Sequence, residues 1–265
     1  MIDVKNTVMT LDGIFWNESE ILSKMMDDDF YYNYLGVNAL SSSSCKKLLD
    51  SPVDYRNSLL ETNNTGDKIQ PFRDGGLFHM RILEPEKWES LNFIDVASKN
   101  TKKYRLAVEE LGTVYTYKER EQAEKMALAF NSNEKAADFL RNSRREVPAI
   151  GEIEGIPFRA KADILGPNYI CDLKSTGDIF KFKYSADRYC YDLQAYIYCE
   201  LFNISYKDFT FVAVDKSTQL VGLFPCSREF YERGKYKALE AIQIYKDFFI
   251  DKKKPVDDFY LYDVL

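Results

Sequence analysis

Between residues 38 and 143, apolar side chains recur every three or four positions, which is the spacing of amphipathic helices. Two short helices are predicted in ALSSSSCKKLLDSPVDYRNSLLE, where serines offer N-caps and Pro52 suits a first turn. Another helix is predicted to open near Asp74 and to end before Pro85, and helical spacing then continues with a break at Asn131 to Asn133. Residues 1–37 ahead of these helices are predicted to form a short hairpin and an irregular arm.

From residue 144 the period falls to about two, which is typical of strands. The stretch REVPAIGEIEGIPFRAKADILGPNYICDLKST holds three strand-like runs separated by turns at GEIEG and GPN, and predicts an antiparallel meander. A helix in DRYCYDLQAYIYCELFN, two strands in KDFTFVAVDK and QLVGLFPCS, and a last helix follow. We therefore expect one α/β domain over 1–265, with a helical portion at 38–143 and a core at 144–265 built on a mixed sheet flanked by helices.

Composition narrows the class of protein. The chain has 265 residues, a formal charge of -6, and no run of about 18 apolar residues, so we expect a cytoplasmic protein without a membrane span. Its five cysteines are scattered and never in C-x-x-C spacing, which argues against a zinc or iron–sulphur cluster. The overall charge disfavours a nucleic-acid partner, but residues 159–188 carry six basic against four acidic side chains, a local excess of two.

Charged residues gather on the second and third strands of the predicted meander. Alternation places Arg159, Lys161 and Asp163 on one face of the second strand, and Asp172 and Lys174 on one face of the third. The short loop LGPN brings the two aspartates to matching heights, within reach of one cation. Such carboxylates repel each other unless a cation lies between them. For the D-x-K pattern alone, a surface ladder of Asp and Lys is the favoured alternative.

This arrangement suits hydrolysis of a phosphodiester. Mg²⁺ takes carboxylate oxygens, carbonyls and water as ligands, and it lowers the pKa of bound water for attack on phosphorus. Lys174 would position or deprotonate that water, or stabilise charge on the phosphate oxygens. The only histidine, His79, lies on the helix before Pro85. Helical spacing alone favours a buried structural histidine, whereas the nearby carboxylates favour a metal ligand.

The stretches GGLFHMRILEPEKW, EGIPFRAKADIL, CDLKSTGDIFKFK and YDLQAYIY resemble the RecE-like (exodeoxyribonuclease VIII) exonucleases of the PD-(D/E)XK nuclease superfamily. The resemblance covers about residues 38–205 and implies a restriction-endonuclease-like core and a phage-derived protein. By position, Asp163 matches the family's first metal-binding aspartate, and Asp172 and Lys174 match its D-x-K pair. His79 matches the histidine that completes the metal site, with the Leu173 carbonyl as a further metal ligand.

The resemblance also implies supporting residues. Gln194 of the Y-x-x-Q motif is expected to orient the attacking water, and Tyr191 lies one turn before it. Glu146 best matches the family's glutamate at the start of the first strand, although Glu152 remains an alternative. Glu146 is expected to pair across from Lys161 and to lie diagonal to Asp163, and a plain Glu146–Lys161 ion pair explains it equally well. The expected DNA contacts are Arg159, Lys161, Lys181, Lys183, Arg188 and Tyr191.

The predicted activity is that of a Mg²⁺-dependent exodeoxyribonuclease with two ions per active site and with Mn²⁺ able to substitute. The resemblance implies 5′-to-3′ digestion of linear double-stranded DNA, 3′ single-stranded tails for recombination, a homo-oligomeric ring and a RecT-like single-strand annealing partner in a bacterial host cell. The alternatives are a structure-specific or restriction-type endonuclease on the same fold and a non-catalytic DNA-binding or scaffolding module.

Overall fold

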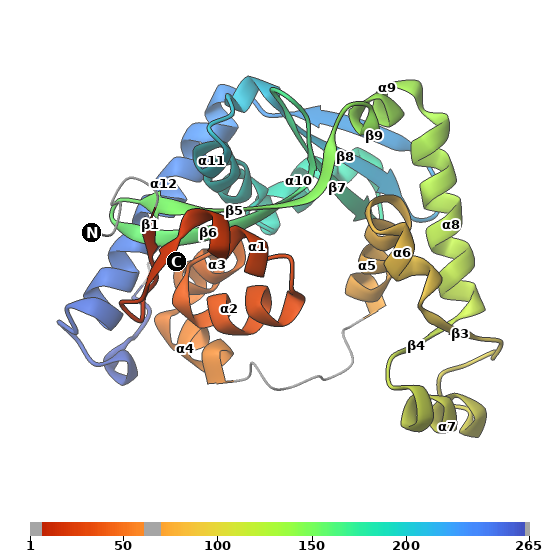
Figure 1. Cartoon of the computed structure of the whole chain (residues 1–265), viewed down its shortest axis with the longest axis horizontal. Coiled ribbons are helices and arrows are strands. Elements are labelled where there is room, and N and C mark those ends of the chain that lie inside the picture. Colours follow the sequence, from red (N-terminus) through yellow and green to blue (C-terminus); the bar gives the residue numbers. More distant parts are fainter. Residues whose placement is uncertain (1–6, 61–69, 263–265) are drawn as a thin grey trace.

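The computed structural model describes residues 7–60 and 70–262 of the chain. A five-stranded mixed sheet in the order β5-β6-β7-β8-β9 forms its centre (Figure 1). β5, β6 and β7 form the predicted antiparallel meander, β8 runs parallel to β7, and β9 is antiparallel to β8. The strands are β5 (Arg144–Ile153), β6 (Ile156–Leu165), β7 (Ile170–Thr176), β8 (Phe209–Asp215) and β9 (Val221–Pro225).

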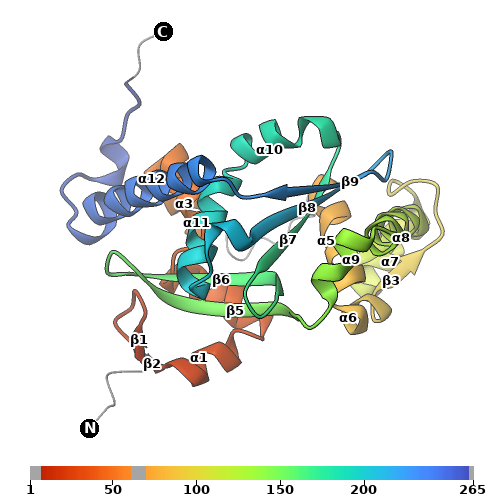
Figure 2. The same cartoon turned by 90° about the horizontal axis from the view of Figure 1, so that it is seen from above.

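Helices cover both faces of this sheet, as Figure 2 shows from above. The helices before the sheet are α3 (Ser42–Asp50), α4 (Pro52–Leu60), α5 (Gln70–Leu83), α6 (Pro85–Glu89), α7 (Lys102–Leu111), α8 (Tyr117–Ser132), α9 (Glu134–Ala137) and the 3-10 turn η3 (Asp138–Leu140). Those within and after it are η4 (Ile179–Lys181), α10 (Phe182–Arg188), α11 (Tyr191–Phe202), η5 (Tyr206–Asp208), α12 (Arg228–Tyr245), η6 (Lys246–Ile250) and η7 (Val256–Asp258). None of the described helices is long and apolar enough to cross a membrane.

The period-two pattern of the strands separates two cores. Val212 and Val214 of β8 pack on α5 and α8, whereas Phe209, Phe211 and Ala213 of the same strand pack on α10 and α11. A third core joins α3, α11 and α12 to the β5–β6 hairpin. The predicted α/β class and the flanking helices are therefore confirmed. The break expected at Asn131 to Asn133 is also present, since Asn133 caps the start of α9.

The N-terminal segment differs from its prediction. The hairpin is present as β1 (Thr7–Met9) and β2 (Phe15–Asn17), but the segment after it is helical rather than irregular. It forms α1 (Glu18–Lys24), the π-helix η2 (Phe30–Tyr34) and α2 (Leu35–Asn38), whose apolar side chains pack on Ile150 of β5. Short helices of this kind are stabilised by tertiary packing more than by propensity, so the local pattern is weak. A further short parallel pair, β3 (Asn92–Ile94) and β4 (Val114–Thr116), flanks α7.

A close approach of α11 and α12 holds one side of the sheet. Asp192 of α11 is fully buried and binds Arg233 and Lys237 of α12, at 2.5 Å and 2.8 Å. Between those two cations, Gly234 lies so close to α11 that a Cβ atom would overlap the carbonyl oxygen of Asp192. Only glycine fits there without moving a helix.

Replacing Gly234 by alanine should therefore destabilise the protein although alanine favours helices. We expect a loss of about 2 kcal/mol or more from overpacking, or a fall of roughly 4–8 °C in the thermal midpoint, measured by circular dichroism. Gly76→Ala in α5 is the matched control, because a Cβ there meets nothing within 4 Å. An unchanged midpoint for Gly234→Ala would contradict the close packing.

Candidate metal and catalytic site

The candidate site lies where β6 and β7 separate. The two strands pair only at Ile164 with Cys171 and at Leu165 with Ile170. Beyond these pairs, the Asp163 carboxylate takes the place of a backbone acceptor: its Oδ2 accepts the Leu173 N–H at 2.7 Å. The side chain thereby satisfies an amide that the diverging ladder leaves unpaired. The gap that opens exposes one edge of β7 to side chains from α5, β5 and α11.

Three side chains from three elements form a cluster of metal-ligand type in this gap. His79 of α5, Glu146 of β5 and Asp163 of β6 each bring one donor atom within 4.8 Å of the other two. His79 Nδ1 lies 3.5 Å from Asp163 Oδ2. One imidazole nitrogen and two carboxylate oxygens are a donor set that divalent cations accept, with room for water as further ligand. These residues can hold a metal ion.

The position of Glu146 corrects the expected register. The β5–β6 hairpin turns at Glu154 and Gly155, so Lys161 pairs with Pro148 and Glu146 stands opposite Asp163. The expected pairing of Glu146 with Lys161 is therefore wrong, and Lys161 instead binds Asp28. Glu146 also adopts a left-handed backbone conformation with φ of 50°, which interrupts the ladder between its neighbours. Glu152, the alternative, is exposed at the far end of the hairpin.

Among the three cluster residues, Glu146 has a raised pKa. Burial raises its pKa, the negative charge of Asp163 raises it further, and the result is a pKa of about 8 instead of 4.5. An acid with these surroundings loses its proton readily only if a positive charge arrives nearby. A bound divalent cation would supply that charge. The electrostatics and the donor set are therefore both compatible with a divalent cation at this cluster.

Asp172 has different partners. Its carboxylate is almost fully buried, forms an ion pair with Lys174, and accepts a hydrogen bond from Gln194 Nε2 at 2.5 Å. It is outside the cluster formed by His79, Glu146 and Asp163. Burial raises the pKa of Asp172 to about 6 against the opposing charge of Lys174. The Asp172–Lys174 pair and Gln194 thus form a second group beside the cluster.

Lys174 is held as a cation. Burial disfavours its charged form, but the charge of Asp172 outweighs this and raises the pKa of Lys174 above its ordinary value. Its ammonium also lies 4.8 Å from the centroid of the Tyr191 ring, and Tyr191 stacks on Phe211 at 5.4 Å. Tyr191, expected to contact DNA, is therefore half-buried and packs against Lys174.

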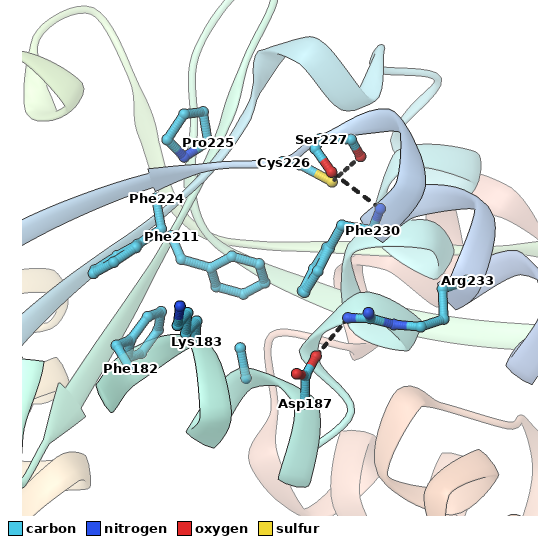
Figure 3. A pocket seen from close by; sticks show the side chains of 11 residues that line it. Phe182, Lys183, Asp187, Phe211, Phe224, Pro225, Cys226, Ser227, Phe230 and Arg233 are labelled. Carbon is cyan, nitrogen blue, oxygen red and sulfur yellow. Dashed lines mark hydrogen bonds and ion pairs between the residues drawn. The ribbon is translucent and has the colours of Figure 1, made fainter. Parts of the chain in front are cut away.

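Behind this stack lies an aromatic cavity of about 320 Å³ (Figure 3). Phe182, Phe211, Phe224 and Phe230 line it, and Arg233 and Asp187 pair at its edge. Phe211 pairs with Asp172 in the β7–β8 register, so the cavity lies one strand away from the acid. The rings give Tyr191 and Lys174 an apolar backing.

The expected DNA contacts divide into two groups. Arg159 is buried and donates to the carbonyls of Leu35 and Ala39, both at 2.5 Å, where it fixes the end of α2. This burial contradicts its expected contact with DNA. In contrast, Lys181, Lys183 and Arg188 are exposed on η4 and α10 and remain candidates. The amino group of Lys161 is largely covered by the N-terminal segment.

Three residues near the site were missed by the pattern: Asp28, Tyr32 and Lys87. Asp28, the middle residue of the DDD run at 27–29, bridges Lys87 of α6 and Lys161 of β6. Tyr32 of η2 lies close enough to the site that, after burial, the charges of Asp28, Glu146 and Asp163 raise its pKa. These residues come from distant parts of the chain with no local spacing that could signal them.

Comparison with known proteins agrees with this geometry. A family model described as "PDDEXK-like domain of unknown function (DUF3799)" matches residues 41–257, which is most of the chain. The chain belongs to this family. A RecE-like assignment and a phage origin remain predictions.

One solved structure shows the same fold. A crystal structure of a candidate exonuclease from Eubacterium rectale matches with a TM-score of 0.63 and 13% identity, over 90% of this chain and 95% of that chain. The crystal structure of SSO0001 has a TM-score of only 0.30 at 16% identity, over 68% of this chain and 87% of that chain, and carries no argument. No curated protein sequence matches the chain. The PDDEXK-like fold is thus shared with the first structure at low identity.

The raised pKa of Glu146 predicts a pH-dependent cost of folding in this PDDEXK-like protein. Between about pH 4.5 and 8 the folded state holds a proton that the unfolded chain releases, so stability from this group is lost as pH rises to 8. Glu146→Gln does not titrate. In EDTA, its thermal midpoint relative to wild type should therefore rise by at least about 3 °C between pH 5.5 and 8.5.

Glu152→Gln is the matched control for this measurement. Glu152 is exposed on the same strand, so its substitution should leave the pH profile of the midpoint unchanged. If Glu146→Gln and Glu152→Gln gave the same profile as wild type, the raised pKa of Glu146, and with it the burial of this side chain beside Asp163, would be refuted.

Proposed function

We propose that the protein is a Mg²⁺-dependent exodeoxyribonuclease that acts on the ends of linear double-stranded DNA. The observation that carries the proposal is the pair of adjoining groups at the separation of β6 and β7. One is the His79–Glu146–Asp163 cluster, and the other is Asp172 with Lys174 and Gln194. The family and the likeness in fold to a candidate exonuclease support a nuclease.

Each group has a distinct task in this proposal. His79, Glu146 and Asp163 would hold a cation, which when bound lowers the pKa of a water molecule and neutralises charge on the scissile phosphate. Lys174, held protonated, would lie against the phosphate oxygens and stabilise the charge that builds there. This favours electrostatic stabilisation over proton abstraction among the roles expected for Lys174. Gln194 holds Asp172 and has an amide that can orient water.

Asp172 would join a second cation site when the DNA phosphate brings its own negative charge. Its Oδ2 is buried and contacts Lys174 Nζ in the ion pair, while its Oδ1 accepts from Gln194. A phosphate that draws Lys174 away would leave this oxygen as a ligand position, and the Leu173 main chain lies between the two groups. The proposal thus keeps Asp172 and the Leu173 carbonyl as ligands in the DNA-bound state. Mn²⁺ would serve in place of Mg²⁺.

Digestion of a linear 5′-phosphorylated duplex in Mg²⁺ tests the activity. Asp172→Asn keeps the shape of the side chain but removes the charge that opposes Lys174, and should lower the rate by about 10²-fold or more. Asp54→Asn, on the exposed face of α4, changes the same side chain and should retain the rate of wild type. Equal rates for wild type and Asp172→Asn would overturn the assignment of this site.

A covalently closed circle of the same sequence separates the exonuclease from its rivals. An exonuclease requires an end and leaves the circle intact, whereas a structure-specific or restriction-type endonuclease opens it. A DNA-binding module without catalysis would bind both DNAs and degrade neither. End labels on the linear duplex report the polarity, which we propose to be 5′ to 3′, with a ring of subunits and a RecT-like annealing partner proposed on the family resemblance.

Metal binding at the cluster can be measured without DNA. A ligand that binds only the folded state raises the thermal midpoint, by an amount that grows with concentration over the dissociation constant. Mg²⁺ should raise the midpoint of wild type at pH 8, and His79→Ala should remain folded but show less than half of that rise. An undiminished rise in His79→Ala would make His79 a structural histidine.

A further inference from the structure

Asp28 joins three elements at the edge of the candidate site. It lies just before η2 in the N-terminal segment, and its two carboxylate oxygens contact Lys87 Nζ at 2.8 Å and Lys161 Nζ at 3.2 Å. The Lys161 side chain is only 10% exposed, whereas Asp28 and Lys87 are about half exposed. Partial burial acts to raise the pKa of Asp28, but the two lysines outweigh it and lower the pKa.

Both lysines are tied to the candidate metal cluster by the fold. Lys161 precedes Asp163 by two residues on β6. Lys87 lies on α6, which begins two residues after α5, the helix that carries His79. Lys161 also lies 4.5 Å from the Tyr31 ring centroid and 5.7 Å from that of Tyr32. Two cations and two aromatic rings thus lie beside the cluster, together with Glu84, which pairs with Lys87 at 2.7 Å.

The N-terminal segment does not need Asp28 in order to stay in place. Ile21, Met25, Tyr31 and Leu35 are buried in a core shared with Ile150 of β5. Arg159 of β6 further fixes the end of α2 through its two carbonyl contacts. The Asp28–Lys87 pair joins two half-exposed partners and adds little to such packing, typically about 0–1 kcal/mol. A contribution to fold stability therefore explains poorly why a carboxylate lies between the two lysines.

Two lysine ammonium groups around one anion are an arrangement that also suits a phosphate, as each can donate to a separate oxygen. Resting on the nuclease function proposed above, we propose that Lys87 and Lys161 bind a phosphate of the DNA strand beside the metal cluster. In the free protein, Asp28 occupies this phosphate position. DNA must displace the carboxylate. Asp28 therefore lowers the affinity for any strand that places a phosphate there.

The DDD run supplies a matched test. Asp28→Asn removes the competing charge, while Asp29→Asn makes the same chemical change one residue away, where the side chain accepts a hydrogen bond from Asn33. Binding of a labelled linear duplex is measured in EDTA, so that no cleavage occurs. We expect Asp28→Asn to bind about fivefold or more tightly than wild type, and Asp29→Asn to bind within about twofold of it.

Lys87→Ala measures the other side of the contact. It should weaken DNA binding and lower the slope of log affinity against log salt by about one, because one phosphate contact is lost. In the Lys87→Ala background, Asp28→Asn should gain less than it does in wild type. Circular dichroism of each variant reports that the fold is retained.

Two further measurements identify the source of the phosphate. Duplexes with a 5′-phosphate and with a 5′-hydroxyl distinguish a terminal from an internal phosphate, and a gain in Asp28→Asn with either DNA supports the proposal. Inorganic phosphate is the alternative occupant. If it raises the thermal midpoint of Asp28→Asn over that of Asp29→Asn while DNA affinity is the same for both, the position binds free phosphate and the proposal is overturned.

The failure of this proposal can be told from failure of the nuclease function. Equal DNA affinity for wild type, Asp28→Asn and Asp29→Asn, together with Mg²⁺-dependent cleavage, would refute the phosphate position alone. Weaker binding by Asp28→Asn would refute it in the same way and make Asp28 a clamp. No DNA binding by any of the three proteins at low salt would overturn both proposals.

Discussion

Buried negative charge between β6 and β7 is the constraint on which the rest of the site depends. Asp163 and Asp172 approach each other where the ladder between these strands stops after two residue pairs, and the β5–β6 register places Glu146 opposite Asp163. Taking carboxylates out of water is costly unless each is protonated, paired or bound to a cation. The protein balances Asp172 with Lys174 and leaves Glu146 with a raised pKa. A site with this imbalance is arranged for a positive charge that the chain itself does not supply.

Contacts outside the gap between β6 and β7 offset the unfavourable free energy of burying these carboxylates. Helices α5 and α8 bury one face of β7 and β8, while α11 and α12 are locked together by Asp192, its two cations and Gly234. Asp163 contributes directly, since it satisfies the Leu173 N–H as well as facing His79. The side chain that creates the repulsion thus also completes the backbone hydrogen bonding of the opened strand. Removal of this acid would affect the strand and the cluster together.

The sequence predicted those parts of the fold and the site that depend on local period and spacing. Periodicity within a few residues predicts the three strands from residue 144 and the helix with His79. It also predicts that Asp163 lies beside Asp172 and Lys174 on adjoining strands. The register of β5 did not follow, because it depends on whether the turn is centred on Ile153 and Glu154 or on Glu154 and Gly155. The short N-terminal helices and Asp28 could not be found, since packing on β5 and contacts over more than fifty residues determine them.

The charge balance also explains why an acidic protein can act on a polyanion. The formal charge of -6 is spread over the chain, while the lysines that matter lie around the gap and are already paired: Lys174 with Asp172, and Lys161 and Lys87 with Asp28. Pairing holds these ammonium groups in position at little cost in net charge. A phosphate that replaces a carboxylate partner would contact lysines that are already in position. Its binding would not require long-range attraction to the whole protein. Under the proposed function, affinity for DNA would depend on exchange of anions at a few positions, and Asp28 would govern it more than the total charge does.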